Sequence, residues 1–304
     1  MANLGKFLNT TRATIDKLEF GGEPRPYLGM SGIGFHCTKG IFLNFHWAQV
    51  EKHSARTERI FNAGHLFEPQ IIKQLKLAGL EVYKILEDTK ENRENSEVYE
   101  VTKDGKLKVA HYGMPDEIQE EYIGFAKHAK GHSDGRVKGV VEDPEVEHIL
   151  EVKTMKESKF KNLCKEGVKR ECPEYFAQCQ RYMRGSGLKW ALFIAVNKNT
   201  SHLYIERVKY NDSIAQELAR KEHLIIMSDI VPYSDYAKDY YKCDICYVKE
   251  VCKGERPVSK NCRTCKFCDI EDEGKWSCSK KDRKFLSTEE QRVGCDDYIL
   301  GWDL

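Results

Sequence analysis

The chain has 304 residues, 40% hydrophobic and 32% charged, a composition typical of a folded globular protein and not of a disordered one. Its 49 basic and 48 acidic residues nearly cancel, so overall charge neither indicates nor excludes a nucleic-acid partner. No apolar run approaches the roughly 18–20 residues of a membrane span, and the start of the chain lacks a signal peptide. We therefore expect a cytoplasmic protein without membrane contact.

Early in the chain, a helix is predicted from about Thr57 to Ala78, where apolar residues recur every three or four positions and Gly79 suits a helix end. Its expected buried stripe is Ile60, Gly64, Phe67, Ile71 and Leu75. Residues 81–125 are predicted to form short strands, with a hairpin turn at Lys103–Lys106.

After residue 125, strands and helices alternate. Strands are predicted at 130–141, 147–153, 190–196 and 202–208, and helices from Pro173 to about Arg184 and at 212–227. The first two strands are expected to form a hairpin around the turn 142–145. This order predicts an α/β fold, a central mixed sheet flanked by helices.

Two carboxylates and a lysine fall on the first of these hairpins. Glu151 and Lys153 point to one face of their strand because side chains alternate, and the hairpin can bring Asp134 beside Glu151. Converging carboxylates repel each other, and Mg²⁺ or Mn²⁺ is the usual relief, with the carbonyl of Val152 as a further ligand. Such a centre could hydrolyse a phosphodiester, with Lys153 orienting water or neutralising a phosphoryl oxygen. The alternative is a solvated ion pair and a turn residue.

Two helical motifs accompany this centre. Gln178 and Tyr182 lie four residues apart on one helix face and could contact a phosphate or base, or simply belong to an amphipathic helix. His65 and Glu68, next to Gly64, are also neighbours on one face, and either could complete the metal ligands.

In this order, Gly64/Glu68, Asp134, Glu151/Lys153 and Gln178/Tyr182 resemble the motifs of the RecB-like branch of the PD-(D/E)xK nuclease superfamily, and most of all its phage-encoded exonucleases. The resemblance covers roughly residues 30 to 255. It implies a Mg²⁺- or Mn²⁺-dependent deoxyribonuclease that acts in phage DNA processing or recombination, in the host cytoplasm and alongside replication or recombination proteins. It favours Glu68 as a ligand, with His65 as the alternative. An endonuclease of the same fold, or a catalytically silent DNA-binding scaffold, remains a second interpretation.

Eight of the twelve cysteines lie between Cys243 and Cys295, which suggests metal ligation in a reducing compartment. Cys243, Cys246 and Cys252 form a compact triplet that needs a fourth ligand. In RecB-like nucleases with an iron–sulfur cluster, a cysteine before the first motif completes such a triplet, and Cys37 has that place. The resemblance therefore implies a [4Fe–4S] cluster, whereas four thiolates alone would equally accept Zn²⁺. The alternative for Cys37 is a buried small hydrophobe.

A second set is typical of a zinc ribbon. The expected structural Zn²⁺ ligands are Cys262, Cys265, Cys278 and Cys295, with Cys268 left over. Trp276 and Tyr298 could form a small core beside them. The chain is thus predicted to divide into a nuclease domain, 1–255, and a zinc-ribbon-like module, 256–304, that could scarcely fold without metal.

A lysine-rich stretch follows the Glu151–Lys153 strand. Lys156, Lys159 and Lys161 are suited to contacting DNA phosphates, and the alternative is an ordinary solvated face.

Overall fold

The structure is a computed structural model, and it describes residues 5–21, 23–35, 37–50, 52–86, 98–101, 107–111, 120–237 and 240–303. None of the helices in these ranges combines the length and the apolar character that a bilayer crossing requires. The predicted turn at Lys103–Lys106 lies outside the described residues, apart from the strands on either side of it.

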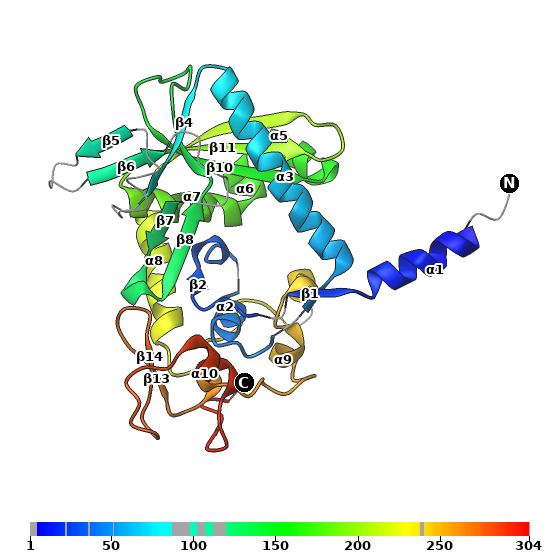
Figure 1. Cartoon of the computed structure of the whole chain (residues 1–304), viewed down its shortest axis with the longest axis vertical. Helices are drawn as coiled ribbons and strands as arrows, with labels where there is room; N and C mark the ends of the chain where they lie inside the picture. The colour runs from blue at the N-terminus through cyan, green and yellow to red at the C-terminus, as the bar shows by residue number, and fades with distance from the viewer. Residues whose placement is uncertain are drawn as a thin grey trace.

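A seven-stranded mixed sheet forms the centre of the fold (Figure 1). In spatial order its strands are β12 (Leu203–Lys209), β11 (Trp190–Asn197), β10 (His148–Met155), β9 (Gly135–Lys138), β4 (Glu81–Leu86), β6 (Leu107–His111) and β5 (Val98–Val101). Strands β10 and β11 pair in parallel, and all the other neighbours are antiparallel. The predicted hairpin of β11 and β12 is confirmed, and so is the pairing of β5 with β6.

Helices cover both faces of this sheet, which confirms the predicted α/β class with a central mixed sheet. The helices are α1 (Gly5–Asp16), α2 (Thr38–Phe45), α3 (Ala55–Leu77), α5 (Glu157–Glu166), α6 (Val168–Glu171), α7 (Pro173–Ser186), α8 (Asp212–Met227), α9 (Lys249–Lys253) and α10 (Thr288–Val293). Short 3-10 turns are η1 (Met30–Gly32), η2 (Phe125–Lys127), η3 (Tyr241–Ile245) and η4 (Cys262–Thr264). The helices predicted to start near Thr57, Pro173 and residue 212 are confirmed as α3, α7 and α8.

Alternation along β10 and β11 separates two cores. Leu150 and Val152 pack with Ile71 of α3 on one face, whereas Ile149 and Phe193 pack with residues of α5, α7, α8 and α2 on the other. Side chains of a strand alternate between faces, so odd-numbered residues of β10 face α7 and even-numbered ones face α3. This fixes Glu151 and Lys153 on the face toward α7.

The predicted strand 130–141 is wrong as a single strand. Its first half, β8 (Ala129–Ser133), belongs to a separate three-stranded sheet with β2 (Leu28–Gly29) and β7 (Glu120–Ile123). Its second half is β9 of the large sheet, and Asp134 lies between the two. Gly135, the first residue of β9, has a φ of 146° that L side chains rarely adopt, which permits the chain to change sheets there.

The apolar stripe predicted along α3 is buried only in its second half. Ile71 is 4% exposed and packs on the sheet, but Ile60 is 39% exposed. In Figure 1 the first half of α3 extends beyond the sheet, toward the small β1–β3 pair (Glu19–Gly21 and Lys52–Ser54). The side chains of this half therefore border a cleft and not the core.

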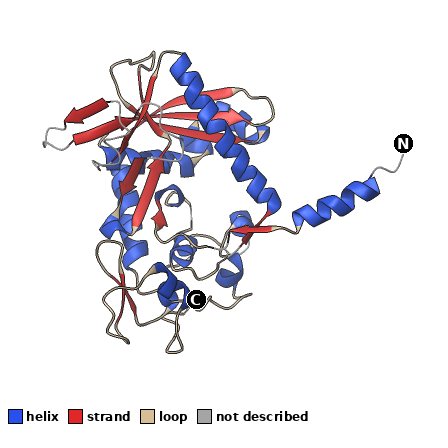
Figure 2. Ribbon diagram, in the orientation of Figure 1, coloured by secondary structure: helices blue, strands red, loops and turns tan. Residues whose placement is uncertain are grey.

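The C-terminal segment is mostly loop (Figure 2), with one hairpin, β13 (Cys268–Ile270) and β14 (Trp276–Cys278). The small core predicted around Trp276 and Tyr298 is not self-contained, because Trp276 is 1% exposed and packs in the main core against Phe45 and His46. Tyr298 instead approaches Thr264, with 3.2 Å between their hydroxyl oxygens. The boundary at residue 255 stays a prediction.

His46, at the end of α2, makes the fold sensitive to acid. Burial lowers the pKa of His46 to about 4, from an ordinary value of 6.5. Between these pH values the unfolded chain binds the extra proton, so stability falls as the pH drops, by about 3 kcal/mol at pH 4 from this group. Between pH 6.5 and pH 4, the free energy of unfolding of wild type should fall by about 3 kcal/mol relative to that of His46→Gln, which has no imidazole to protonate. Equal pH slopes for wild type and variant would contradict this; His202→Gln, at an exposed position, is the control.

Candidate active site

The site begins where the pairing of β9 with β10 stops. The last pair is Gly135 with Leu150. Beyond it, Asp134 completes the edge of β10: its backbone N–H donates to the carbonyl of Leu150 (3.2 Å), and its Oδ2 accepts from the N–H of Val152 (2.6 Å). The N–H and C=O of one strand residue point to the same side, so the Val152 carbonyl faces the same edge as Asp134.

Glu151 lies beside Asp134 with no exposed surface. Its Oε1 accepts hydrogen bonds from Lys153 and from Gln178 Nε2, the latter at 2.8 Å. Its Oε2 is buried, and no donor among the described residues contacts it. Burial raises the pKa of Glu151 to about 8; the charges of Asp134 and Glu68 add to the rise, and Lys153 opposes it.

Lys153 is the cation of this group, and its side chain is 23% exposed. Burial alone would lower its pKa, but the carboxylates of Glu151 and Asp134 hold that pKa above the usual value. The ammonium also lies 5.4 Å from the ring centre of Tyr175. Lys153 therefore stays charged beside two carboxylates.

Helix α7 supplies the predicted Gln178 and Tyr182, one turn apart. Gln178 Nε2 donates to the Tyr182 hydroxyl at 2.9 Å as well as to Glu151. Both side chains are buried, at 4% and 2% exposure. Gln178 therefore positions the Glu151 carboxylate, and Tyr182 holds Gln178; both residues also line the cleft, and the phosphate or base contact suggested by the sequence stays a prediction.

Gly131 of β8 packs closely against the ring of Tyr182. A Cβ at this position would lie 2.5 Å from Tyr182 Cε1 and 2.9 Å from Met30 Cβ, closer than real atoms approach. We expect Gly131→Ala to push Tyr182 away and to cost about 1–3 kcal/mol of stability. Thermal unfolding measures this.

Gly64→Ala is the matched control for Gly131→Ala. Its Cβ would meet only Thr154 Oγ1, at an ordinary 3.8 Å, and alanine favours the helix. It should therefore stabilise the chain by up to about 1 kcal/mol. Equal effects of the two substitutions would show that crowding of Tyr182 is not the cause.

Helix α3 brings Gly64, His65 and Glu68 to the same place. All three line the cleft that contains Asp134, Glu151 and Lys153, a cavity of about 580 Å³. Glu68 is partly buried and close enough for its charge to raise the pKa of Glu151, whereas His65 is exposed at the rim. The preference for Glu68 over His65 as a metal ligand stays a prediction, and both residues line the cleft.

Several residues that line the cleft escaped the sequence interpretation: Arg25, Tyr27, Lys130, His132, Tyr175 and Lys198. Strand periodicity could have indicated two of them. Lys130 and His132 precede Asp134 at two-residue intervals, so they share its face of the strand up to the break.

The lysines predicted to contact DNA do not line this cleft. Lys161 is exposed and pairs with Glu157 at 2.7 Å, and Lys156 stands at the N-cap position of α5 without a side-chain capping bond. Lys159 pairs with Glu174 at 2.9 Å and lies 5.0 Å from the ring centre of Tyr175, which is a cleft residue. A DNA contact of these three side chains stays a prediction.

The donor set suits a hard divalent cation. Asp134, Glu151 and Glu68 are carboxylates that line one cleft, and Oε2 of Glu151 is buried with no donor from the described chain. As the side chains stand, no three His, Cys, Asp or Glu residues in the described ranges are gathered tightly enough to hold a metal. At this centre Lys153 donates to one oxygen of Glu151, and the N–H of Val152 donates to one oxygen of Asp134.

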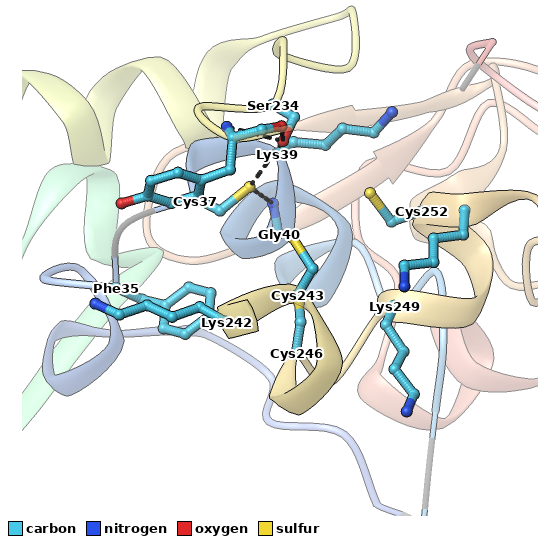
Figure 3. A pocket seen from close by; sticks show the side chains of 12 residues that line it. Phe35, Cys37, Lys39, Gly40, Ser234, Lys242, Cys243, Cys246, Lys249 and Cys252 are labelled. Atoms are coloured by element: carbon cyan, nitrogen blue, oxygen red, sulfur yellow. Dashed lines mark hydrogen bonds between the residues drawn. The ribbon is translucent and has the colours of Figure 1, made fainter. Parts of the chain in front are cut away.

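The first cysteine set converges on one small hollow, of about 70 Å³ (Figure 3). Cys37 comes from the start of α2, and Cys243, Cys246 and Cys252 come from η3 and α9. The N–H of Gly40 donates to Cys37 Sγ at 3.4 Å, and a Cβ on Gly40 would meet Cys246 Sγ at the same distance.

Burial and the neighbouring thiols of Cys37, Cys252 and Cys243 raise the pKa of Cys246. Four lysines line the same hollow: Lys39, Lys242, Lys249 and Lys253. Thiols that gather beside cations suit a thiolate-bound centre, either an iron–sulfur cluster or Zn²⁺.

The second set also comes together. Burial raises the pKa of Cys262 to about 11, and the thiols of Cys295, Cys265 and Cys278 contribute in that order. Cys268 pairs with Cys278 across the β13–β14 hairpin, and the pKa of its thiol is raised by burial and by the thiols of Cys262, Cys265 and Cys278. All five cysteines thus remain candidates for four positions.

No protein-family model matches the chain, and neither does any curated protein. Among solved structures, it is similar to an alkaline exonuclease (LHK-Exo) from Laribacter hongkongensis, with 13% identity over 77% of this chain and 96% of that one, at a TM-score of 0.41. LHK-Exo in complex with dAMP gives 14% identity, 76% and 95% coverage, and a TM-score of 0.42. The protein SSO0001 gives 11% identity over 83% of this chain and 96% of that one, at a TM-score of 0.40. The functional conclusion below rests on the side chains of the cleft.

Proposed function

We propose that this chain is a divalent-metal-dependent DNA nuclease of the PD-(D/E)xK type. One observation carries the proposal: Asp134, Glu151 and Lys153 meet at the edge of β10, beside the carboxylate of Glu68. A buried carboxyl group whose pKa is raised by burial and by neighbouring carboxylates, as that of Glu151 is, costs folding free energy, and such groups are typical of catalytic centres.

In this proposal Asp134, Glu151, Glu68 and the Val152 carbonyl hold Mg²⁺ or Mn²⁺. When bound, the ion activates water and neutralises charge on the phosphate. Lys153 orients the attacking water or contacts a phosphoryl oxygen, for which its position beside Glu151 is suited. Gln178 holds the Glu151 carboxylate, and Tyr182 anchors Gln178.

The motif set resembles phage-encoded exonucleases, so we favour an exonuclease of phage DNA processing or recombination, which acts on DNA beside replication or recombination proteins in the host cytoplasm. An endonuclease would use the same residues. A silent DNA-binding scaffold is the less favoured function, because it would have no use for a charged, partly buried lysine beside the carboxylates of Glu151 and Asp134.

The deciding experiment offers end-labelled linear DNA and covalently closed circular DNA to the wild-type chain with Mn²⁺, with Asp134→Asn as the inactive control. Release of label from linear DNA alone supports the exonuclease. Cutting of closed circles favours the endonuclease. If wild type cleaves neither DNA, the nuclease proposal is wrong.

For the cysteines we propose a [4Fe–4S] cluster at Cys37, Cys243, Cys246 and Cys252, with Zn²⁺ as the alternative, and a structural Zn²⁺ at Cys262, Cys265, Cys278 and Cys295. Anaerobically purified wild type should be brown, with absorbance near ~400 nm, and should carry iron and sulfide. Cys37→Ser should lose this absorbance, whereas Cys164→Ser, at an exposed position, should keep it. A colourless wild type with only zinc would refute the cluster.

A further inference from the structure

The C-terminal segment contacts the rest of the chain through the acidic turn between β13 and β14. The N–H of Gly274 donates to the carbonyl of Ala126 at 2.8 Å, and Glu273 pairs with Lys127. A Cβ on Gly274 would lie only 3.0 Å from the carbonyl oxygen of Lys127, so the two backbones pack closely. The acidic turn is therefore engaged in contacts within the chain.

A second turn of the same segment, residues 279–285, is exposed throughout. Backbone hydrogen bonds join Cys278 and Arg283 in both directions, at 2.7 and 3.0 Å, and close this turn. Ser279 donates to the carbonyl of Phe267 from its N–H at 2.9 Å and from its hydroxyl at 3.2 Å. The backbone of the turn is therefore fixed, while its side chains face solvent.

Lysines gather on this second turn. Lys280, Lys281 and Lys284 belong to it, and Lys266 lies beside it. Nζ of Lys266 and Nζ of Lys280 are 5.0 and 5.7 Å from the ring centre of Phe267. None of the four lysines pairs with a carboxylate in the part of the chain that the structure describes. The turn holds four basic residues and one acidic residue, so its like charges repel each other until an anion binds.

The chemistry of this turn fits phosphates better than it fits a protein. Lysine is depleted in the centres of protein–protein interfaces, whereas lysine and arginine supply the phosphate contacts of protein–DNA interfaces. A lysine that neutralises a phosphate releases a condensed counterion, which requires neither a deep pocket nor apolar surface. Because the backbone of the turn is already fixed, binding costs little ordering of the chain.

The turn lies away from the catalytic cleft. The described residues that line the cleft come from positions 25 to 198 of the chain. In Figure 1, β13, β14 and α10 lie at the end of the molecule opposite the large sheet. A phosphate contact at this turn would therefore hold DNA at a second place, apart from the carboxylates of the cleft.

We propose that the basic turn, residues 279–285 together with Lys266, binds the phosphate backbone of DNA outside the catalytic cleft. This rests on the proposed nuclease function and adds a second contact with the same substrate. The contact is independent of base sequence, because phosphates carry no sequence information.

The salt dependence of binding tests the basic turn. Anisotropy of a labelled duplex of about 30 base pairs, about 100 Å long, is measured between about 50 and 200 mM salt. All chains carry Asp134→Asn, so that the DNA stays intact in Mg²⁺ without a chelator. We expect Lys280→Gln/Lys284→Gln to raise the Kd about tenfold at about 150 mM salt. The slope of log K against log salt should become shallower by about 1.5, since each lost phosphate contact removes about 0.7–0.9.

Two further double variants serve as controls. Lys280→Arg/Lys284→Arg keeps both charges and should bind like the Asp134→Asn chain. Lys73→Gln/Lys76→Gln removes two exposed lysines from α3, and it should change neither the Kd nor the slope. Because Cys278 adjoins the turn, the zinc content of every variant is measured. If the glutamine double variant loses zinc, Lys284→Gln decides, with about half the change in slope.

The basic turn is not a DNA contact if the glutamine double variant binds like the Asp134→Asn chain at every salt concentration. Equal losses in Lys73→Gln/Lys76→Gln, or no binding of DNA by any chain, would overturn it as well. Cleavage by wild type with Mn²⁺ separates the two proposals. Cleavage without the change in salt slope overturns only the basic turn. Binding through the turn without any cleavage overturns the nuclease function and leaves the contact standing.

Discussion

Lys153→Met should cleave DNA about 10²–10³-fold more slowly than wild type at saturating Mn²⁺, with little change in substrate affinity. The substitution keeps the length of the side chain but removes the ammonium that contacts Glu151. Charge that develops on the phosphate during attack then loses the protein cation beside Glu151. Single-turnover rates measure the loss.

Lys159→Met is the control for charge alone. Lys159 also pairs with a carboxylate, that of Glu174 at 2.9 Å, and also lies over the ring of Tyr175. It does not line the cleft, so its loss should change the rate less than about threefold. If the two variants lose cleavage rate equally, Lys153 contributes only through its positive charge. If Lys153→Met is fully active, Lys153 has no role in catalysis.

Arg263→Met should lower the free energy of unfolding by about 3 kcal/mol. Arg263 is 3% exposed and stacks with Trp47 (3.8 Å to the ring centre) and Trp276 (4.5 Å). It donates to Gln291 Oε1 and to the carbonyls of Phe45 and Pro26. The variant leaves these three acceptors without their donor, and each costs about 1 kcal/mol or more.

Burial lowers the pKa of Arg263 to about 9, so the charge itself is held at a cost that methionine would relieve in part. The hydrogen bonds and ring contacts outweigh this, and Arg263→Lys should not restore stability, because one ammonium cannot reach three acceptors. Arg283→Met, in the same segment but half exposed, should change stability by less than about 0.5 kcal/mol. Denaturant unfolding measures all three, and a variant as stable as wild type would contradict the prediction.

Local patterns were enough to predict much of this fold. Helices α7 and α8 and the β11–β12 hairpin follow from periodicity, from Pro173 at a helix start and from a polar turn. Helix α2 could not be predicted in this way. Five of its eight residues, Gly40, Ile41, Phe42, Leu43 and Phe45, are buried on different sides of the helix, so no amphipathic stripe marks it.

For the candidate site, the sequence predicted which residues meet but not how. Alternation placed Glu151 and Lys153 on one face of β10, as the structure has them. The hydrogen bond of Gln178 to Glu151 could not be predicted, because it depends on how α7 packs over the sheet. Arg25 and Tyr27 are distant in sequence from every motif, and the pairing of the adjoining β2 with β8 helps to bring them to the cleft.

The position of Asp134 between β8 and β9 has a consequence for length changes in the chain. Deletion of one residue from β9 would turn its remaining side chains to the opposite face of the sheet, because strand side chains alternate. Deletion from β8 would do the same in the other sheet. Asp134 would then lose either the Leu150 carbonyl or the Val152 N–H. We therefore expect homologous chains to vary in length in the turn after β9 and not at this junction.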